Sequence, residues 1–312
     1  MQSVSILIVS PDGNTVATAG DRYVQVWDRS LKTRLTIMSG HTKPISCITY
    51  SPDGKYIASG SDDCTVRIWD AKTGENVCLL RLMGWAGRIQ YSPDGKFLFS
   101  SNWGTYGIDV WDVNTQAEVR KIRCSTTSAG NFFALSPDGK YMARNEERAD
   151  MYIRDTDTGK AKAILHSSGN KSIVWIAYAP DGKRLAAASG DEMVRVWDLN
   201  TLEGELGCKT TLSGHTGWVI QVMWTKNGHY LVSACTEILM VWDAQTFECV
   251  SRICIQVSSL VFPNLFWYRK GKEVVLEEIP FLSFQEILMS YLSKGEQPLS
   301  DSRVWHKIFQ YL

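Results

Sequence analysis

Short apolar runs alternate with turn-forming residues along most of the chain, and within the runs apolar and polar positions alternate with the two-residue period of β-strands. Residues 45–80 show the pattern most clearly. Runs at 45–50, 56–59, 65–69 and 75–80 are separated by turn residues at 51–54, 61–63 and 71–74. This stretch therefore predicts a small antiparallel sheet of four short strands.

The same unit recurs along the chain, as two independent markers show. Ser-Pro-Asp-Gly stands at 10–13, 51–54, 92–95 and 136–139, with Ala-Pro-Asp-Gly at 179–182 and a degenerate Thr-Lys-Asn-Gly at 225–228; the five prolines are spaced by 41, 41, 44 and 43 residues. Trp-Asp stands at 27–28, 69–70, 111–112, 197–198 and 242–243, and Arg154-Asp155 fills the missing step. Proline presets φ in such a turn, and glycine accepts the left-handed conformation that closes it. Six four-stranded units at this period predict an all-β propeller.

The second unit, Gly40-His41 … Ser51-Pro52-Asp53-Gly54 … Ser59 … Asp63 … Trp69-Asp70, resembles the WD-repeat β-propeller family, and the resemblance covers residues 4 to about 255. In that family a buried hydrogen-bond network stiffens each blade by linking a histidine, a hydroxyl, an aspartate and a tryptophan. The resemblance assigns this structural network to His41, Ser59, Asp63 and Trp69, and to His215, Ser233 and Trp242 of the sixth unit. The sixth unit has no matching aspartate, and in the fifth Ala187 replaces the hydroxyl.

We expect a propeller domain over residues 1–280 with seven blades, the last of them degenerate; six blades are the alternative. Strands at 257–262, 265–268 and 272–279 would form the shortened seventh blade. Because the sequence starts with an innermost strand, we expect the tail to close the ring; the alternative is an imperfect ring. Beyond Phe281 the apolar period becomes helical, which predicts a C-terminal helical hairpin at 281–312 that packs on the propeller or on a partner.

Residues 273–312 also resemble the hinge and first large-lobe helices of a protein kinase. The Gly-rich loop, the His-Arg-Asp motif and the Asp-Phe-Gly motif of kinases are missing from the sequence. The resemblance therefore implies an interrupted fragment without kinase activity. The apolar helical pattern runs to the last residue, which fits truncation of a longer chain.

Composition narrows the class of protein. The 33 Lys and Arg residues balance 33 Asp and Glu residues, which argues against direct binding to nucleic acid or to a membrane surface. The longest notable uncharged run, 253–268, is too short for a spanning helix, and the N-terminus lacks the pattern of a signal peptide. None of the eight cysteines forms a Cys-x-x-Cys pair, so we expect free thiols in the cytoplasm, with the nucleus as the alternative.

The sequence offers no catalytic constellation. It holds five histidines, none of them in a metal-binding helix or a nucleophile elbow, and no phosphate-binding loop. The acidic pairs Asp62-Asp63 and Glu146-Glu147 fall in predicted turns and are expected to be solvated. We therefore predict no enzymatic activity, no cofactor and no metal site.

The candidate binding surface is the propeller face that carries the inter-blade loops. Bulky or cationic residues stand at loop positions there, and such residues are the commonest anchors of protein interfaces. They are Lys43, Trp85, Trp103, Lys171 and Trp218. The alternative is that each tryptophan packs under its own loop and the lysines are merely solvated.

These features predict a scaffold that binds a protein or peptide partner on the loop face, as a member of a multiprotein complex. Two further hypotheses stay open. Residues 57–72, which end in Trp-Asp-Ala-Lys, resemble the repeat through which some WD proteins dock the adaptor of a cullin-type ubiquitin ligase, with Lys72 in place of the commoner arginine. The kinase-like tail suggests instead a truncated regulatory sensor.

Overall fold

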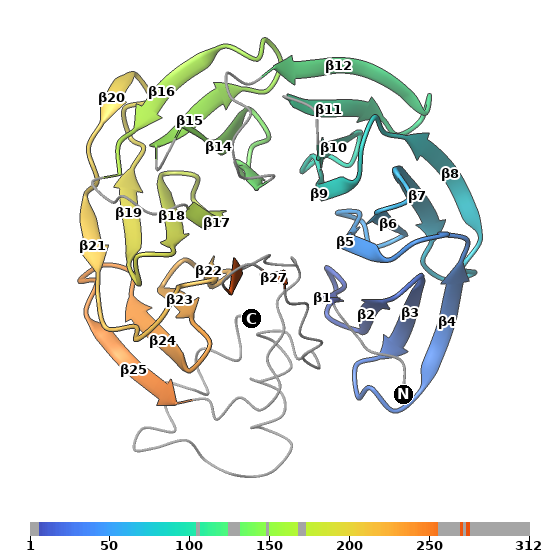
Figure 1. Ribbon diagram of the computed structural model, residues 1–312, viewed down its shortest axis with the longest axis horizontal. Helices are drawn as coiled ribbons and strands as arrows, with labels where there is room; N and C mark the ends of the chain where they lie inside the picture. The colour runs from blue at the N-terminus through green and yellow to red at the C-terminus, as the bar shows by residue number, and fades with distance from the viewer. Residues whose placement is uncertain are drawn as a thin grey trace.

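The computed structural model describes residues 6–103, 107–123, 132–147, 150–167 and 173–254, together with the backbone of 269–270 and 273–274. These residues form six sheets of four or five strands that follow one another around a central axis, like the blades of a propeller (Figure 1). Within each sheet the chain starts at the innermost strand and moves outward. The all-β repeat architecture predicted from the two markers is confirmed for this part of the chain.

The strands of the six blades, numbered in chain order, have the following bounds. Blade 1 contains β1 (Ile6–Val9), β2 (Thr15–Gly20), β3 (Tyr23–Asp28) and β4 (Arg34–Ser39). Blade 2 contains β5 (Ile45–Tyr50), β6 (Tyr56–Ser61), β7 (Thr65–Asp70) and β8 (Asn76–Arg81). Blade 3 contains β9 (Ala86–Tyr91), β10 (Phe97–Asn102), β11 (Gly107–Asp112) and β12 (Ala117–Arg123).

The second half of the ring has the same order. Blade 4 contains β13 (Phe133–Leu135), β14 (Tyr141–Glu147), β15 (Asp150–Asp155) and β16 (Ala161–Leu165). Blade 5 contains β17 (Ile173–Tyr178), β18 (Arg184–Ser189), β19 (Val194–Asp198) and β21 (Thr210–Leu212). Blade 6 contains β22 (Gln221–Trp224), β23 (Tyr230–Ala234), β24 (Ile238–Asp243) and β25 (Cys249–Cys254).

The Pro-Asp-Gly turns fold through the side chains that define the motif. In the second copy the Ser51 hydroxyl donates to Asp53 Oδ1 at 2.7 Å and accepts the Tyr56 amide at 2.9 Å. Gly54 has a φ of +73°, the left-handed region that favours glycine. The degenerate copy folds the same way, because Asn227 Oδ1 accepts the Thr225 hydroxyl at 2.7 Å. Local turn chemistry therefore fixes the hairpin even where the motif has drifted.

The hydrophobic core lies between neighbouring blades. Trp69 of β7 packs in one cluster with Ile6 and Val24 of blade 1, and its exposed fraction is 1%. Trp197 of β19 packs in the same way with Met151 of blade 4. Each of blades 2 to 6 thus buries one sheet face against the blade before it, so stability depends on the interfaces between repeats.

Blades 4 and 5 are joined by a strand that the repeat pattern did not predict. Between β19 and β21 the chain forms β20 (Gly204–Leu206), which pairs in parallel with β16 at the outer edge of blade 4. The His166 amide extends this pairing by donating to the Leu206 carbonyl at 3.0 Å. This strand covers an edge that would otherwise present unpaired backbone groups.

The predicted seventh blade and helical hairpin fall almost wholly outside the described residues. Only the short pair β26 (Arg269–Lys270) and β27 (Glu273–Val274) is described there, and it is antiparallel. The blade count, the ring closure, the hairpin at 281–312 and the kinase-like stretch at 273–312 therefore stay predictions. Among the described residues, no helix is long and apolar enough to cross a membrane.

Candidate functional site

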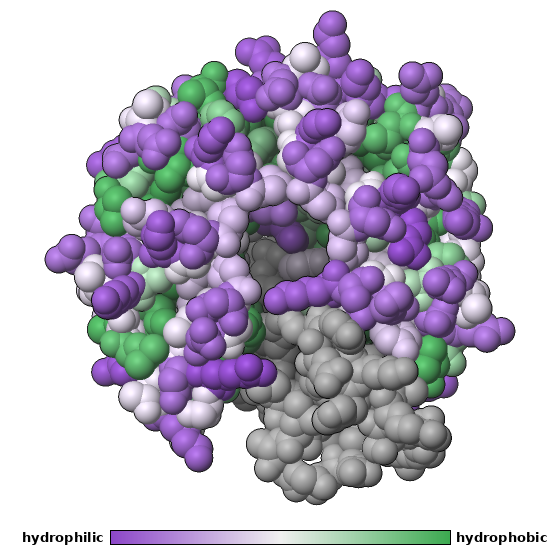
Figure 2. Space-filling view, turned by 180° about the vertical axis from the view of Figure 1, so that it is seen from behind, coloured by the Kyte–Doolittle hydropathy of each residue, from purple (hydrophilic) through white to green (hydrophobic). Residues whose placement is uncertain are grey.

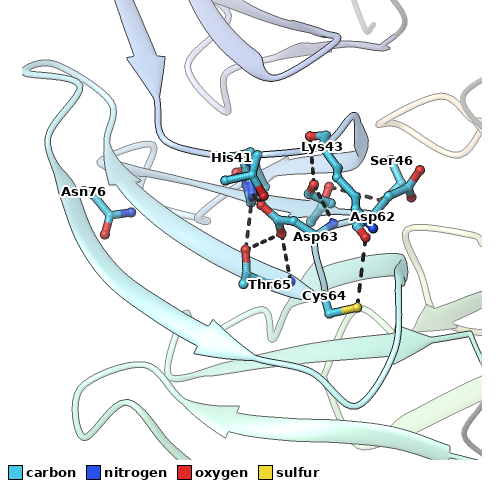
Figure 3. A network of polar contacts seen from close by, with 12 residues as sticks. His41, Lys43, Ser46, Asp62, Asp63, Cys64, Thr65 and Asn76 are labelled. Carbon is cyan, nitrogen blue, oxygen red and sulfur yellow. Dashed lines mark hydrogen bonds and ion pairs between the residues drawn. The ribbon is translucent and has the colours of Figure 1, made fainter.

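A buried hydrogen-bond network crosses blade 2 (Figure 3). The Ser59 hydroxyl accepts the indole N–H of Trp69 at 2.8 Å and lies 2.7 Å from His41 Nε2. The other ring nitrogen, Nδ1, lies 2.9 Å from Asp63 Oδ2. A neutral imidazole satisfies all three bonds when Nδ1–H donates to the carboxylate and Nε2 accepts the serine proton. The polar groups of the network therefore satisfy one another, which is the structural role expected from the sequence.

The sequence predicts that Asp63 is solvated, and this prediction is wrong. In the structure its side chain is only 6% exposed. Burial raises the pKa of this carboxyl, but hydrogen bonds from the Thr65 hydroxyl, the Thr42 amide and His41 outweigh burial and lower the pKa below its usual value. Burial lowers the pKa of His41 in turn, against the opposing pull of Asp63. Both groups are engaged with neighbours and are poorly placed for proton transfer to a ligand.

Blade 6 carries the same network without the aspartate. The Ser233 hydroxyl accepts the Trp242 indole N–H at 2.8 Å and lies 2.7 Å from His215 Nε2. In the described part of the chain, the other ring nitrogen of His215 has no hydrogen-bond partner. Burial, aided by the charge of Arg252, lowers the pKa of His215 to about 4. His215 is therefore neutral at physiological pH.

Two of the predicted partner-binding tryptophans lie together on blade 3. The Trp103 amide donates to the Trp85 carbonyl at 2.8 Å, which joins the loop before β9 to the loop after β10. At Gly84 a Cβ atom would lie 1.9 Å from the Trp103 carbonyl oxygen, so only glycine permits this approach. Met83 adds a third apolar side chain, 83% exposed, beside Trp85 at 49% and Trp103 at 55%. We call Met83, Trp85 and Trp103 the blade-3 cluster.

The other predicted binding residues do not join this cluster. Trp218 is 48% exposed but precedes β22 in blade 6, on the far side of the ring from blade 3 (Figure 1). Lys43 is exposed in the loop before β5, where its carbonyl accepts the Ser61 hydroxyl at 3.0 Å. Lys171 lies outside the described residues. Lys72 is exposed in the turn after β7, at the opposite end of blade 2 from Lys43.

The WD40 family (WD domain, G-beta repeat) matches residues 2–28, 32–70, 160–198 and 206–243. The chain carries WD40 repeats in these four places. A second family, described as a seven-bladed β-propeller lactonase, matches residues 70–178, the stretch that includes the one repeat without a Trp-Asp pair. Both matches agree with the blades seen in the structure.

Curated proteins similar to this chain include a complex subunit, a ribosome biogenesis protein and a nuclear distribution protein. Mouse (Mus musculus) Target of rapamycin complex subunit LST8 is 25% identical over 237 residues, 69% of this chain and 70% of LST8. The Ribosome biogenesis protein WDR12 homolog of Ixodes scapularis is 25% identical over 255 residues, 77% of this chain and 54% of that protein. Nuclear distribution protein PAC1 of Arthroderma benhamiae is 26% identical over 250 residues, 74% of this chain and 47% of PAC1. The chain spans about half the length of the last two.

Blade 4 departs furthest from the WD repeat. Arg154 takes the position of the tryptophan and forms two hydrogen bonds with Glu146, from Nε at 2.5 Å and from Nη2 at 2.6 Å. The Glu146 side chain is fully buried, and it lies in strand β14 rather than in the solvated turn expected from the sequence. A charged pair thus replaces the usual indole–hydroxyl bond.

Blade 5 shows a milder departure. Because Ala187 stands where other blades have a hydroxyl, the Trp197 indole donates to the backbone carbonyl of His166 at 3.2 Å.

Throughout the described ranges no group of three or more His, Cys, Asp or Glu side chains is arranged to hold a metal ion. The blade-3 cluster places exposed apolar side chains on two adjoining loops.

Proposed function

We propose that this WD-repeat protein is a non-enzymatic scaffold that binds a protein or peptide partner on its loop face, with the blade-3 cluster as the anchor. The observation that carries the proposal is the exposure of three large apolar side chains on two loops that are hydrogen-bonded to each other. Large apolar side chains exposed on adjoining loops favour an interaction site, and tryptophan is enriched among the energetic anchors of such sites.

The rigidity of the cluster supports this role. The bond from the Trp103 amide to the Trp85 carbonyl and the close approach at Gly84 hold the two loops in one arrangement before any partner arrives. A surface that is already ordered loses less conformational entropy when it binds. The cluster is therefore suited to be an anchor that the partner fits.

Charge near the cluster narrows the chemistry of the partner. Arg81 ends β8 just before Met83, and Arg123 ends β12 opposite Gly107, at the loop-face end of blade 3. Both arginines are exposed, as is Lys43 on the neighbouring blade. An apolar segment flanked by acidic residues would complement this surface. The relatives agree with a binding role, since LST8 is named as a subunit of a complex.

The test is affinity capture from cell extract with the tagged full chain, after circular dichroism has shown that each variant is folded. The variants are Trp85→Ala/Trp103→Ala and, as a matched control with an equally exposed tryptophan on blade 6, Trp218→Ala. Truncation of an anchor tryptophan costs about 2 kcal/mol or more, which weakens binding by about 30-fold. We expect partners of the wild type to be lost with the double variant and kept with the control. Retention by the double variant, or loss with Trp218→Ala alone, would show that the anchor is elsewhere.

A further inference from the structure

The innermost strands of the six described blades carry a single charged side chain. The sequences of β1, β5, β9, β13, β17 and β22 are ILIV, ISCITY, AGRIQY, FAL, IVWIAY and QVMW. Only Arg88, the third residue of β9, is charged. These strands surround the central opening of the ring, which is visible as a hollow in the space-filling view (Figure 2). Arg88 is thus a lone cation on an otherwise uncharged wall.

The Arg88 side chain reaches the central space and contacts an aromatic ring there. Its guanidinium carbon lies 4.3 Å from the ring centroid of Trp175, in β17 of blade 5. Blade 4 lies between blades 3 and 5, so side chains from β9 and β17 meet only in the space that the blades surround. Phe132, just before β13, extends the aromatic wall, with its ring centroid 6.0 Å from that of Trp175. Residues from three blades therefore converge at this point.

The charge of Arg88 has no acidic partner within the described ranges, where none of the ion pairs involves it. Burial lowers the pKa of its guanidinium to about 10, so the cation is partly desolvated but still charged at neutral pH. Its titratable neighbour is Cys47, whose pKa is raised by burial to about 11, which leaves the thiol neutral. A desolvated cation beside a neutral thiol is a favourable position for an anion.

The contact with Trp175 is a cation–π contact, with the guanidinium carbon over the ring. The N–H donors of a guanidinium lie along its edge and match the two oxygens of a carboxylate or phosphate. The aromatic contact therefore positions the guanidinium without using these donors.

We propose that Arg88, held by Trp175, forms an anion-binding subsite in the central channel that takes a carboxylate or phosphate group. This site is separate from the blade-3 cluster, and the inference does not depend on the proposed scaffold function.

Isothermal titration calorimetry on the full chain tests the subsite, at constant ionic strength set with sodium chloride. The probes are inorganic phosphate and three blocked tripeptides that differ at the central residue: Ac-Ala-Glu-Ala-NH2, its phosphoserine counterpart and the neutral Ac-Ala-Gln-Ala-NH2. Each probe is titrated into the wild type, Arg88→Met, Arg88→Lys and Arg34→Met. The Arg34 variant removes an exposed arginine at the start of β4 and is the matched control for loss of one positive charge.

We expect saturable binding of an anionic probe to the wild type and to Arg34→Met, with binding about tenfold weaker or absent in Arg88→Met. Arg88→Lys keeps the charge without the two-pronged geometry and should bind with intermediate affinity. Comparing the affinities of the glutamate and phosphoserine peptides shows whether the subsite prefers a carboxylate or a phosphate. Comparing the affinities of free phosphate and the phosphoserine peptide shows whether the peptide backbone contributes to binding. If no anionic probe binds better than the glutamine peptide up to about 50 mM, or if Arg88→Met binds as the wild type does, Arg88 serves only to pack blades 3 and 5 together and the proposal is wrong.

Discussion

Replacing Ser59 with alanine tests whether the hydroxyl at the centre of the blade-2 network holds two buried groups at once. Its oxygen accepts the Trp69 indole N–H and bonds the His41 ring. Ser100 of blade 3 is the matched control within the same molecule: it is equally buried, but among the described residues its hydroxyl bonds the Trp111 indole alone, at 2.9 Å. The two substitutions remove the same atom from the same position of the repeat.

The magnitudes follow from the number of groups left without a partner. Each buried polar group that loses its hydrogen bond costs about 1–3 kcal/mol. Ser59→Ala leaves two such groups and should lower the free energy of unfolding by about 2–6 kcal/mol, whereas Ser100→Ala leaves one and should lower it by about 1–3 kcal/mol. Ser233 makes the same two bonds in blade 6, so Ser233→Ala should resemble Ser59→Ala.

Urea unfolding of the full chain, followed by tryptophan fluorescence and far-ultraviolet circular dichroism, measures these differences as shifts in the unfolding midpoint. The order of midpoints should be wild type, then Ser100→Ala, then Ser59→Ala. Equal shifts for the two variants would refute the reasoning, because the histidine bond would then contribute nothing to stability.

Two further predictions concern buried charge. Glu146→Gln breaks the buried pair with Arg154 and should lower the free energy of unfolding by about 3–5 kcal/mol. Glu205→Gln, at an exposed carboxylate, is the control and should leave the urea midpoint unchanged. A similar midpoint for both variants would contradict the buried pair. His215 has a pKa of about 4 in the folded chain against about 6.5 when unfolded, so only the unfolded chain binds the extra proton between these pH values, and the folded state should lose about 3 kcal/mol as pH falls from 6.5 to 4. When the pH is lowered from 7 to 4, the urea midpoint should therefore fall further for the wild type than for His215→Gln. Equal falls in the two proteins would rule out the assigned pKa.

The sheet architecture could be predicted from the sequence because the turns are local. Each Pro-Asp-Gly turn is closed by contacts between residues at most five apart, so the markers need no tertiary context to be understood. The copy at Thr225 and Asn227 illustrates this, since a changed motif gives the same bonds. Strand β20 could not be predicted in this way, because its partner β16 lies about forty residues earlier in the chain and no repeat position encodes the pairing.

The candidate binding surface was harder to predict for a geometric reason. Equivalent positions in a repeat share a face of the ring, but the ring separates them, so Trp218 lies far from Trp85 although the two align in the sequence. Trp103 and Met83 join Trp85 instead, through a backbone contact that only Gly84 allows. The expectation that Glu146 is solvated was wrong, because Glu146 lies in strand β14 and not in a turn. The arginine at the tryptophan position was the signal that a buried acid would be needed nearby.

Comparison of the six blades shows that the aspartate of the Trp-Asp pair is retained more strictly than the tryptophan. In every described blade this aspartate accepts at least one backbone amide of the turn that follows; the residues are Asp28, Asp70, Asp112, Asp155, Asp198 and Asp243. The indole bond is replaced by a carbonyl acceptor in blade 5 and by an ion pair in blade 4. The difference is physical: a buried donor can be satisfied by any acceptor within reach, whereas the turn amides need an acceptor at one fixed place in the chain. Arg154 could therefore replace a tryptophan while Asp155 kept its role beside it.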